Sequence, residues 1–431
     1  MKKLLSILLA LSMLVCCFAF AACGDSTGND GKDTEANNVQ TGDDTAAQTE
    51  NNGAVADADF KLGVILLHDE FSTYDLNFIN GVEEAKAALG LSDAQVIMKK
   101  NIPESDACYE AACDLVDEGC DVIFADSFGH ETYMFKAAKE FTDVQFCHAT
   151  GTMAHTEGLA NFHNAFASIY EGRYLAGVAA GLKLNAMIEA GTITAEQAKI
   201  GYIGAFTYAE VISGYTSFYL GAKSVCPSVV MDVQFTGSWY DETAEKNAAQ
   251  ALIANDCVLI SQHADSMGAP TACEEANVPN VSYNGSTVED CPNTFIVASR
   301  INWAPYFKLI CENTMKGEAI PTDYTGTIAT GSVVLTEVNE QAAAEGTAAK
   351  LEEVKAALAD GSLKVFDTAT DNFITVGGAK LDSYQADVDT DDAFTPDTEV
   401  VSDGYFHESE YRSAPYFDVR IDGITLLNDA Y

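Results

Sequence analysis

Aromatic and polar side chains follow several short apolar runs of this sequence, at positions where loops are expected. Aromatic rings can stack on a flat heterocycle, while carboxylate, amide and hydroxyl groups match the donors and acceptors along its edge. A carboxylate can also bind the vicinal hydroxyls of a ribose. Each aromatic residue alone is more often part of a core, so the prediction rests on their concentration after successive runs. The candidate ligand-binding residues are Phe71, Ser72, Thr73, Tyr74, Asp126, Ser127, Phe128, Trp239, Asn284 and Trp303.

The sequence offers no recognisable catalytic constellation. Beyond residue 60 it contains no GxSxG elbow, no P-loop and no HExxH pattern, and residues 201–204 lack the further glycine of a dinucleotide fingerprint. His263 and Asp265 could form a base with its orienting carboxylate, but no nucleophile in a recognisable setting accompanies them. We therefore predict a binding protein that has no catalytic residue and no cofactor.

One acidic segment resembles a calcium loop only in part. Asp387, Asp389 and Asp391 match its first three ligand positions. Asp392 stands where the turn needs glycine, and Thr398 stands where the bidentate glutamate belongs. A solvated surface insert is the better interpretation, and no cysteine or histidine cluster has metal-ligand spacing. We predict no metal site.

Alternating strands and helices must position the candidate residues. The first series of expected strands covers 61–67, 96–98, 121–124 and 144–147, with helices near 78–89, 105–118 and 131–141. After an expected helix over 171–187, a second series of strands covers 199–204, 229–235, 258–261, 281–283 and 295–299. Continuous apolar runs are typical of strands buried on both faces of a parallel sheet. The pattern predicts an α/β fold with two β-α-β halves and a ligand site beyond the carboxyl ends of the strands.

The N-terminal residues predict export and a lipid anchor. Lys2 and Lys3 precede an apolar run over 4–22, and two alanines lead directly to Cys23. This order is typical of a lipoprotein signal peptide over 1–22, with Cys23 as the lipidation site. Residues 24–59 carry nine acidic side chains against one lysine, so 23–59 is predicted to be a disordered acidic tether. An uncleaved transmembrane anchor is the alternative, because the apolar run is nearly long enough to span a bilayer.

Length, charge and cysteine usage limit the remaining choices. About 370 residues follow the tether, which favours two domains over one. The formal net charge of −42 makes nucleic acid and anionic lipid surfaces poor partners. Nine cysteines follow Cys23, an odd number scattered singly through apolar segments. Free buried thiols are therefore favoured over a disulfide framework.

Several of these segments resemble the basic membrane protein family of bacterial substrate-binding lipoproteins, which serve ABC importers of purines and purine nucleosides. Residues 171–177 (EGRYLAG) are similar to a family helix, and residues 199–206 (KIGYIGAF) with 221–224 (GAKS) resemble the opening of its second lobe. Three further segments are similar to a purine-binding branch of the family: 238–241 (SWYD), 262–266 (QHADS) and 302–306 (NWAPY).

The resemblance implies a periplasmic-binding-protein-like type I fold, in which two Rossmann-like lobes with parallel sheets are joined by a three-stranded hinge. It implies a first lobe over 60–168 plus 300–328 and a second lobe over 169–299 plus 329–431. An insert is expected near 382–412, and a strand-like pattern resumes at 416–421.

By the same analogy, the ligand contacts fall on Ser72, Thr73, Tyr74, Ser127, Phe128 and Trp239, and further on Asp126 and Asn284. The ligand implied is a purine base or a purine nucleoside. The choice between the two stays open, because Asn284 stands where the family often has an acidic residue.

The resemblance also implies the partners and the place of action. The chain is expected on the extracytoplasmic face of a bacterial cell membrane, attached by a lipid anchor, where it would deliver its ligand to an ABC permease and ATPase complex. Two alternatives remain open. One is a receptor for another small polar solute, such as a sugar or an autoinducer, and the other is a ligand-sensing module for a signalling partner.

Overall fold

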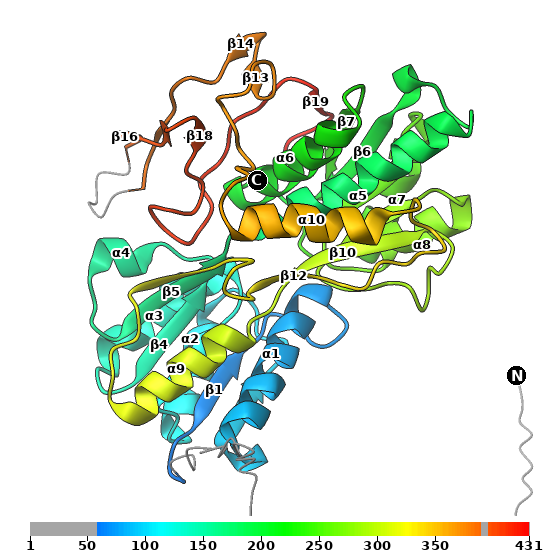
Figure 1. Ribbon diagram of the computed structural model, residues 1–431. Helices are drawn as coiled ribbons and strands as arrows, with labels where there is room; N and C mark the ends of the chain where they lie inside the picture. The colour runs from blue at the N-terminus through cyan, green and yellow to red at the C-terminus, as the bar shows by residue number, and fades with distance from the viewer. Residues whose placement is uncertain (1–57, 389–394, 431) are drawn as a thin grey trace, which may run out of the picture. The chain divides into compact units, whose positions relative to one another are not determined.

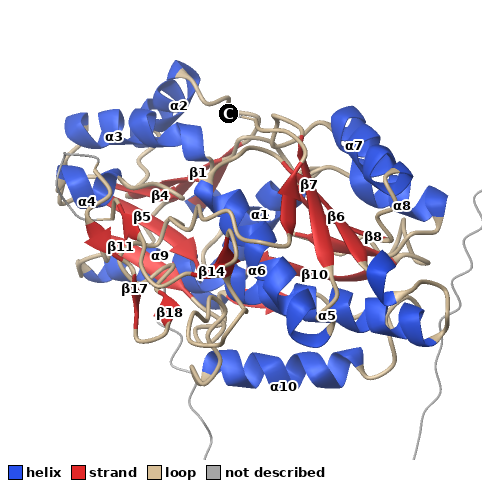
Figure 2. Ribbon diagram, turned by 90° about the horizontal axis from the view of Figure 1, so that it is seen from above, coloured by secondary structure: helices blue, strands red, loops and turns tan. Residues whose placement is uncertain are grey.

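The structure is a computed structural model that describes residues 58–388 and 395–430. Within these residues the chain forms two large β-sheets with helices packed on their faces (Figure 1 and Figure 2). The predicted α/β class is therefore confirmed. Cys23, the predicted signal peptide, all but the end of the predicted tether, and the calcium-loop candidates Asp389 and Asp391 lie outside the described residues.

The first sheet and its helices form lobe 1. Its strand order is β11-β5-β4-β3-β1-β2, and every neighbouring pair is parallel. The strands are β1 (Leu62–Ile65), β2 (Val96–Lys99), β3 (Val122–Ala125), β4 (Gln145–Ala149), β5 (Phe162–Ala167) and β11 (Asp323–Gly326). The helices are α1 (Thr73–Leu89), α2 (Asp106–Asp117), α3 (Glu131–Glu140), α4 (Met153–Glu157) and α9 (Ala304–Lys316). The central strands β1 and β3 are buried along their whole length, as their continuous apolar runs predict.

The second sheet and its helices form lobe 2. Its strand order is β12-β10-β9-β8-β6-β7-β19, and only the β10–β12 pair is antiparallel. The strands are β6 (Lys199–Gly204), β7 (Val230–Phe235), β8 (Leu259–His263), β9 (Asn280–Tyr283), β10 (Phe295–Ile301), β12 (Val333–Leu335) and β19 (Ile424–Leu426). The helices are α5 (Ile169–Glu189), α6 (Ala209–Val225), α7 (Glu242–Ala254), α8 (Gly268–Ala276) and α10 (Thr347–Ala359).

Helices α5 and α6 pack unusually closely on each other in lobe 2. A Cβ atom added to Gly177 would lie 1.9 Å from the carbonyl oxygen of Phe218, and one added to Gly221 would lie 2.0 Å from that of Tyr174. Only glycine leaves room for the two backbones to approach this far. The tight helix pair supports the back of the second sheet.

The chain passes three times between the two lobes. It leaves β5 for α5, leaves β10 for α9, and leaves β11 for β12. A half-buried carboxylate fixes the third passage, because Glu171 at the start of α5 accepts a 2.8 Å hydrogen bond from the backbone N–H of Ile328. Burial raises the pKa of Glu171 to about 7. The three passages form the hinge that the fold class implies.

Residues beyond α10 form short hairpins and a final strand. The hairpins pair β13 (Thr375–Val376) with β14 (Ala379–Lys380), β15 (Gln385–Ala386) with β16 (Thr398–Glu399), and β17 (Val401–Ser402) with β18 (Tyr405–Phe406). The strand expected at 416–421 is wrong, because these residues form no strand. Tyr416 and Phe417 are buried in the core instead, and the chain joins the second sheet later, where β19 pairs with β7.

Two expectations from the sequence concern burial. The nine cysteines of the described residues stand as free thiols, and each except Cys113 is buried, as the apolar segments around them predict. Among the described residues, no helix combines the length and the apolar character needed to cross a membrane.

Candidate ligand-binding site

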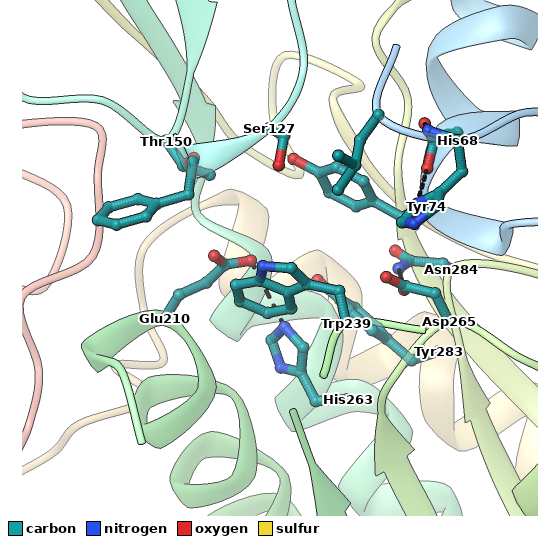
Figure 3. A pocket seen from close by; sticks show the side chains of 13 residues that line it. His68, Tyr74, Ser127, Thr150, Glu210, Trp239, His263, Asp265, Tyr283 and Asn284 are labelled. Atoms are coloured by element: carbon teal, nitrogen blue, oxygen red, sulfur yellow. Dashed lines mark hydrogen bonds and ion pairs between the residues drawn. The ribbon is translucent and has the colours of Figure 1, made fainter. Parts of the chain in front are cut away.

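A pocket lies where the carboxyl ends of strands from both lobes meet (Figure 3). It encloses about 400 Å³ of space not filled by atoms, part of which is open to solvent. Lobe 1 contributes Leu67, His68, Tyr74, Asp75, Ser127, Phe128 and Thr150, and lobe 2 contributes Glu210, Trp239, His263, Asp265, Tyr283 and Asn284. Its place agrees with the rule that open α/β sheets bind ligands beyond the carboxyl ends of their strands.

On the lobe 1 side, the start of α1 holds a buried carboxylate. Ser72 caps the helix by accepting from the backbone N–H of Asp75, and its hydroxyl donates to Asp75 Oδ2 at 2.6 Å. The backbone N–H of His68 donates to Asp75 Oδ1 at 2.7 Å. Burial alone would raise the pKa of Asp75, but hydrogen bonds from the side chains of His68 and Ser72, and from the backbone of His68, lower it, which favours the ionised form.

Asp126 lies behind this carboxylate with no exposed surface. Its Oδ1 accepts from the backbone N–H of Leu67 at 3.0 Å, and its backbone carbonyl accepts from the hydroxyl of Tyr74 at 2.9 Å. Burial raises the pKa of Asp126 well above its usual range, and the charge of Asp75 raises it further. Asp126 is therefore a neutral acid, which holds β1, β3 and Tyr74 in place.

On the lobe 2 side, Asp265 and Asn284 form the opposite polar wall. The amide Nδ2 of Asn284 donates to Asp265 Oδ1 at 3.0 Å. Burial raises the pKa of Asp265 well above its usual range, and the charge of Glu245 adds to this effect. The protonated acid can donate as well as accept a hydrogen bond.

Two pocket residues have left-handed backbone conformations. Asn284 has φ of 64° and Thr150 has φ of 65°. Asparagine tolerates this region, but a β-branched residue such as Thr150 is strained there. Thr150 directly follows β4 at the mouth of the pocket, where strained residues are often part of a binding site.

An aromatic cluster forms one side of the pocket. The ring of Trp239 lies 5.1 Å from that of Phe206 in an edge-to-face arrangement and 6.1 Å from that of Tyr208. Phe128 approaches Tyr208 from lobe 1 at 5.5 Å. In Figure 3 Trp239 lies on the far side of the space from Tyr74 and Ser127. A flat ligand between them would meet an aromatic surface on each side.

The floor of the pocket has polar atoms without protein partners. The hydroxyl of Tyr283 is buried and has no hydrogen-bond partner among the described residues. His263 Nε2 lies 3.4 Å from Glu210 Oε1 (Figure 3). Arg173 is fully buried behind Tyr283, with its guanidinium 4.9 Å from the centre of the Tyr283 ring. A buried hydroxyl without a partner is costly, so Tyr283 is suited to bind a polar ligand atom.

The two lobes touch directly beside the pocket. The backbone N–H of Thr73 donates to the carbonyl of Asp265 at 3.2 Å, and the Thr73 hydroxyl reaches the same oxygen at 3.3 Å. The side chain of Asn77 donates to the carbonyl of Asn284 at 2.8 Å. These bonds between lobes describe a closed cleft.

The structure separates the ten candidate residues into two groups. Five line the pocket: Tyr74, Ser127, Phe128, Trp239 and Asn284. Three others lie just outside it: Ser72 caps α1, Thr73 joins the two lobes, and the carbonyl of Asp126 binds the hydroxyl of Tyr74. Phe71 is 76% exposed and is not part of the lining.

Trp303 lies in the core of lobe 1, away from the pocket lining. Its side chain is 2% exposed and stacks on Phe78 at 4.4 Å. Gly81 makes room for it, because a Cβ atom there would lie 2.8 Å from Trp303 Cβ. Trp303 and Trp239 both follow a strand, so their positions in the sequence did not show that only Trp239 lines the pocket.

Eight lining residues were not among the candidates: Leu67, His68, Asp75, Thr150, Glu210, His263, Asp265 and Tyr283. Thr150 directly follows β4, and His263 ends β8, so the strand-end rule could have found both. Glu210 gave no such signal, because it reaches the pocket from the first turn of α6. In the described residues no group of three or more potential metal ligands occurs.

Comparisons with known proteins identify the family. The model of the Bmp family, whose description is ABC transporter substrate-binding protein PnrA-like, matches residues 67–362. A purine-binding protein of Brucella abortus is 31% identical over 55% of this chain and 65% of its own length. A protein of Haloferax volcanii named as an ABC transporter glucose-binding protein is 30% identical over 50% of this chain and 52% of its own length. This chain thus spans less than two thirds of either relative.

A solved structure supports the fold. The solute-binding protein of an ABC transporter system from Conexibacter woesei superposes with a TM-score of 0.57 at 18% identity, covering 73% of this chain and 99% of the other. At this identity the likeness concerns the fold alone. Since the family match covers more than half of the chain, the chain belongs to the Bmp family of PnrA-like ABC transporter substrate-binding proteins, which bind solutes and are not enzymes.

Proposed function

We propose that this chain captures a purine base or a purine nucleoside in the pocket between its lobes and delivers it to an ABC permease and ATPase complex. The observation that carries the proposal is the pairing of Trp239 and Tyr74 across the pocket with carboxyl groups at its edge. No lysine or arginine is among the residues that line this pocket. The pocket itself therefore suits an uncharged aromatic group.

The polar groups are matched to the edge of a purine. Asp75 is an ionised acceptor, while protonated Asp265 and the hydroxyl of Tyr283 can donate. A purine presents both N–H donors and ring-nitrogen or carbonyl acceptors along its edge. Stacking on Trp239 would contribute about 1 to 3 kcal/mol, as base–aromatic stacking does elsewhere.

A sugar is the second candidate ligand. The named relative from Haloferax volcanii favours it, while the named relative from Brucella abortus favours a purine. Aromatic faces and carboxylates also occur in sugar sites, so the two ligands must be compared directly. A sensing role for a signalling partner remains an alternative to transport.

A calorimetric titration of the protein tests the proposal. The ligands are adenine, guanine, hypoxanthine, their nucleosides, and D-glucose. We expect at least one purine compound to bind below about 100 μM, which corresponds to about −5.5 kcal/mol. Binding of glucose without binding of any purine would contradict the proposal and support the second candidate.

The anchor and the location are part of the same proposal. Cys23 with a diacylglycerol would hold the receptor at the extracytoplasmic face of the membrane, close to its permease. Mass spectrometry of the mature amino terminus tests this point. We expect a chain that begins at a lipidated Cys23, and an uncleaved terminus would support the transmembrane alternative.

A further inference from the structure

A second cavity adjoins the purine pocket. It holds about 1580 Å³ of space not filled by atoms, part of which is open to solvent, and it shares Phe128, Thr150 and Glu210 with the pocket. We call this cavity the vestibule. The shared residues place the two cavities side by side, so that a substituent on a base in the pocket could point towards the vestibule.

The C-terminal residues supply one wall of the vestibule. Asp387, Arg412, Ala414, Pro415, Asp418 and Arg420 line it from this side. All of them lie beyond residues 67–362, the part of the chain that matches the family. The chemistry of this wall is thus a property of the chain itself and cannot be carried over from the family match.

The vestibule holds an unusual share of the arginines. The chain has only four, at positions 173, 300, 412 and 420, while its formal net charge is −42. Two of the four line the vestibule, whereas the lining of the purine pocket includes neither arginine nor lysine. These two positive groups stand beside the pocket and not within it, and they share the vestibule lining with the carboxyl groups of Glu131, Glu210, Asp387 and Asp418.

Arg412 is held in place but has no ion pair. Its Nε donates to the carbonyl of Ala414 at 3.2 Å and its Nη1 to the carbonyl of Asp387 at 3.0 Å. Within the described residues no carboxylate lies within ion-pair distance of Arg412. Burial lowers the pKa of this guanidinium, as expected for a partly desolvated cation. Against this effect, the more distant carboxylates of Asp387, Asp323 and Glu131 favour its charged form and so raise its pKa.

Two of the neighbouring charged groups, Glu131 and Arg420, have other partners. Glu131 Oε1 accepts from the backbone N–H groups of Thr152 and Met153, both at 2.7 Å. Arg420 pairs with Asp429 at 2.9 Å. Arg412 is therefore the charged group of the vestibule best placed to receive an anion, and a guanidinium binds a phosphate through two parallel hydrogen bonds.

We propose that the vestibule binds an anionic substituent, a phosphate ester, on a nucleoside whose base occupies the purine pocket. The ligand class is then the purine nucleoside monophosphates. The inference rests on the proposed purine function and specifies its ligand further.

Calorimetry with matched ligand pairs tests the inference. Adenosine and guanosine are compared with their 5′-monophosphates on the full protein. We expect the monophosphate to bind at least about tenfold more tightly than the nucleoside, the gain of one charged hydrogen-bonded contact. Arg412→Met is expected to remove this gain, so that the monophosphate then binds no more tightly than the nucleoside.

Two further variants serve as a conservative replacement and as a control. Arg412→Lys retains the charge but not the paired donors and should keep only part of the gain, even if Arg412→Met fails to fold. Lys355→Met removes a half-buried cation on α10, outside both cavities, and should leave the gain intact. Nucleosides that bind as tightly as their monophosphates would overturn this inference alone. If neither nucleosides nor monophosphates bind, both this inference and the proposed nucleoside binding are contradicted.

Discussion

The side-chain amide of Asn77 donates a 2.8 Å hydrogen bond to the backbone carbonyl of Asn284, so that helix α1 of lobe 1 is tied to the end of β9 in lobe 2. Asn284 itself lines the pocket and donates to Asp265. Closure of the lobes and formation of the polar wall are thus coupled at a single residue. A ligand that requires this wall would bind the closed form selectively.

Asn77→Ala should weaken ligand binding without a large loss of stability. The change removes one hydrogen bond between the lobes, so we expect affinity to fall by about 1 kcal/mol. Asn185→Ala is the matched control, because Asn185 also donates at 2.8 Å to a backbone carbonyl, that of Val225, but within lobe 2. Calorimetry should show reduced affinity for the first variant and unchanged affinity for the second. Equal affinities for the two variants would argue against this coupling.

The two tryptophans should respond differently to substitution. Trp239→Ala removes the stacking surface and should cost about 1 to 3 kcal/mol of affinity. Trp303→Ala leaves a cavity in the core of lobe 1 and should cost about 3 to 5 kcal/mol of stability. Affinity measurements and thermal unfolding separate the two effects. An undiminished affinity of the Trp239 variant would assign this residue to the core.

The stability of the protein should depend on pH through Glu408. This side chain is 1% exposed, and its pKa is raised to about 7, mainly by burial and in smaller part by the charge of Glu171. Opposing these effects, Ser213, Ser409 and the charge of Arg412 lower it. A carboxyl group with a raised folded-state pKa stabilises the fold fully below its ordinary pKa, and this contribution is lost as pH rises toward about 7.

Glu408→Gln should reduce this pH dependence. The wild type is expected to lose roughly 1 to 3 kcal/mol of stability through this group between about pH 4.5 and pH 7, and the variant should lose less. Glu171 also has a raised pKa of about 7, so some dependence should remain. Thermal unfolding at several pH values measures the difference. Identical curves for the two proteins would show that Glu408 does not titrate in this window.

The thiols should react in two stages. Cys113 is half-buried, and the other eight cysteines of the described residues are buried. Ellman's reagent should modify Cys113 in the native protein and the others only after unfolding in denaturant. Burial also raises the pKa of Cys108, Cys120 and Cys147, which lowers their reactivity further. Thiols that stay unreactive in denaturant without a reductant would indicate disulfides.

The alternation of apolar runs and helical periodicity predicted most strands of both sheets. It missed β5, because His163 and Asn164 interrupt the apolar run at its centre. Both are buried, and each has partners distant in sequence: His163 contacts Gln145, and Asn164 accepts from the backbone N–H of Ala154. Such tertiary partners cannot be read from the local pattern.

The sequence predicted which loops surround the site, but not which of their side chains line it. The strand-end rule placed Tyr74, Ser127 and Trp239 near the pocket, since their loops directly follow strands. It could not separate Trp303 from them, because burial against Phe78 depends on how α9 packs on α1. The final strand was misplaced for a similar reason: the free edge of β7, and not the pattern at 416–421, decides where the chain pairs.

The most direct test of the central claim uses the fluorescence of Trp239. The chain has two tryptophans, and Trp303→Phe leaves Trp239 as the only one. A purine that stacks on Trp239 should quench this fluorescence in a saturable manner, with the same dissociation constant as calorimetry gives. The Trp239→Phe variant, which retains only the buried Trp303, should show almost no change. Unquenched fluorescence of Trp239 at saturating purine would contradict purine capture in this pocket.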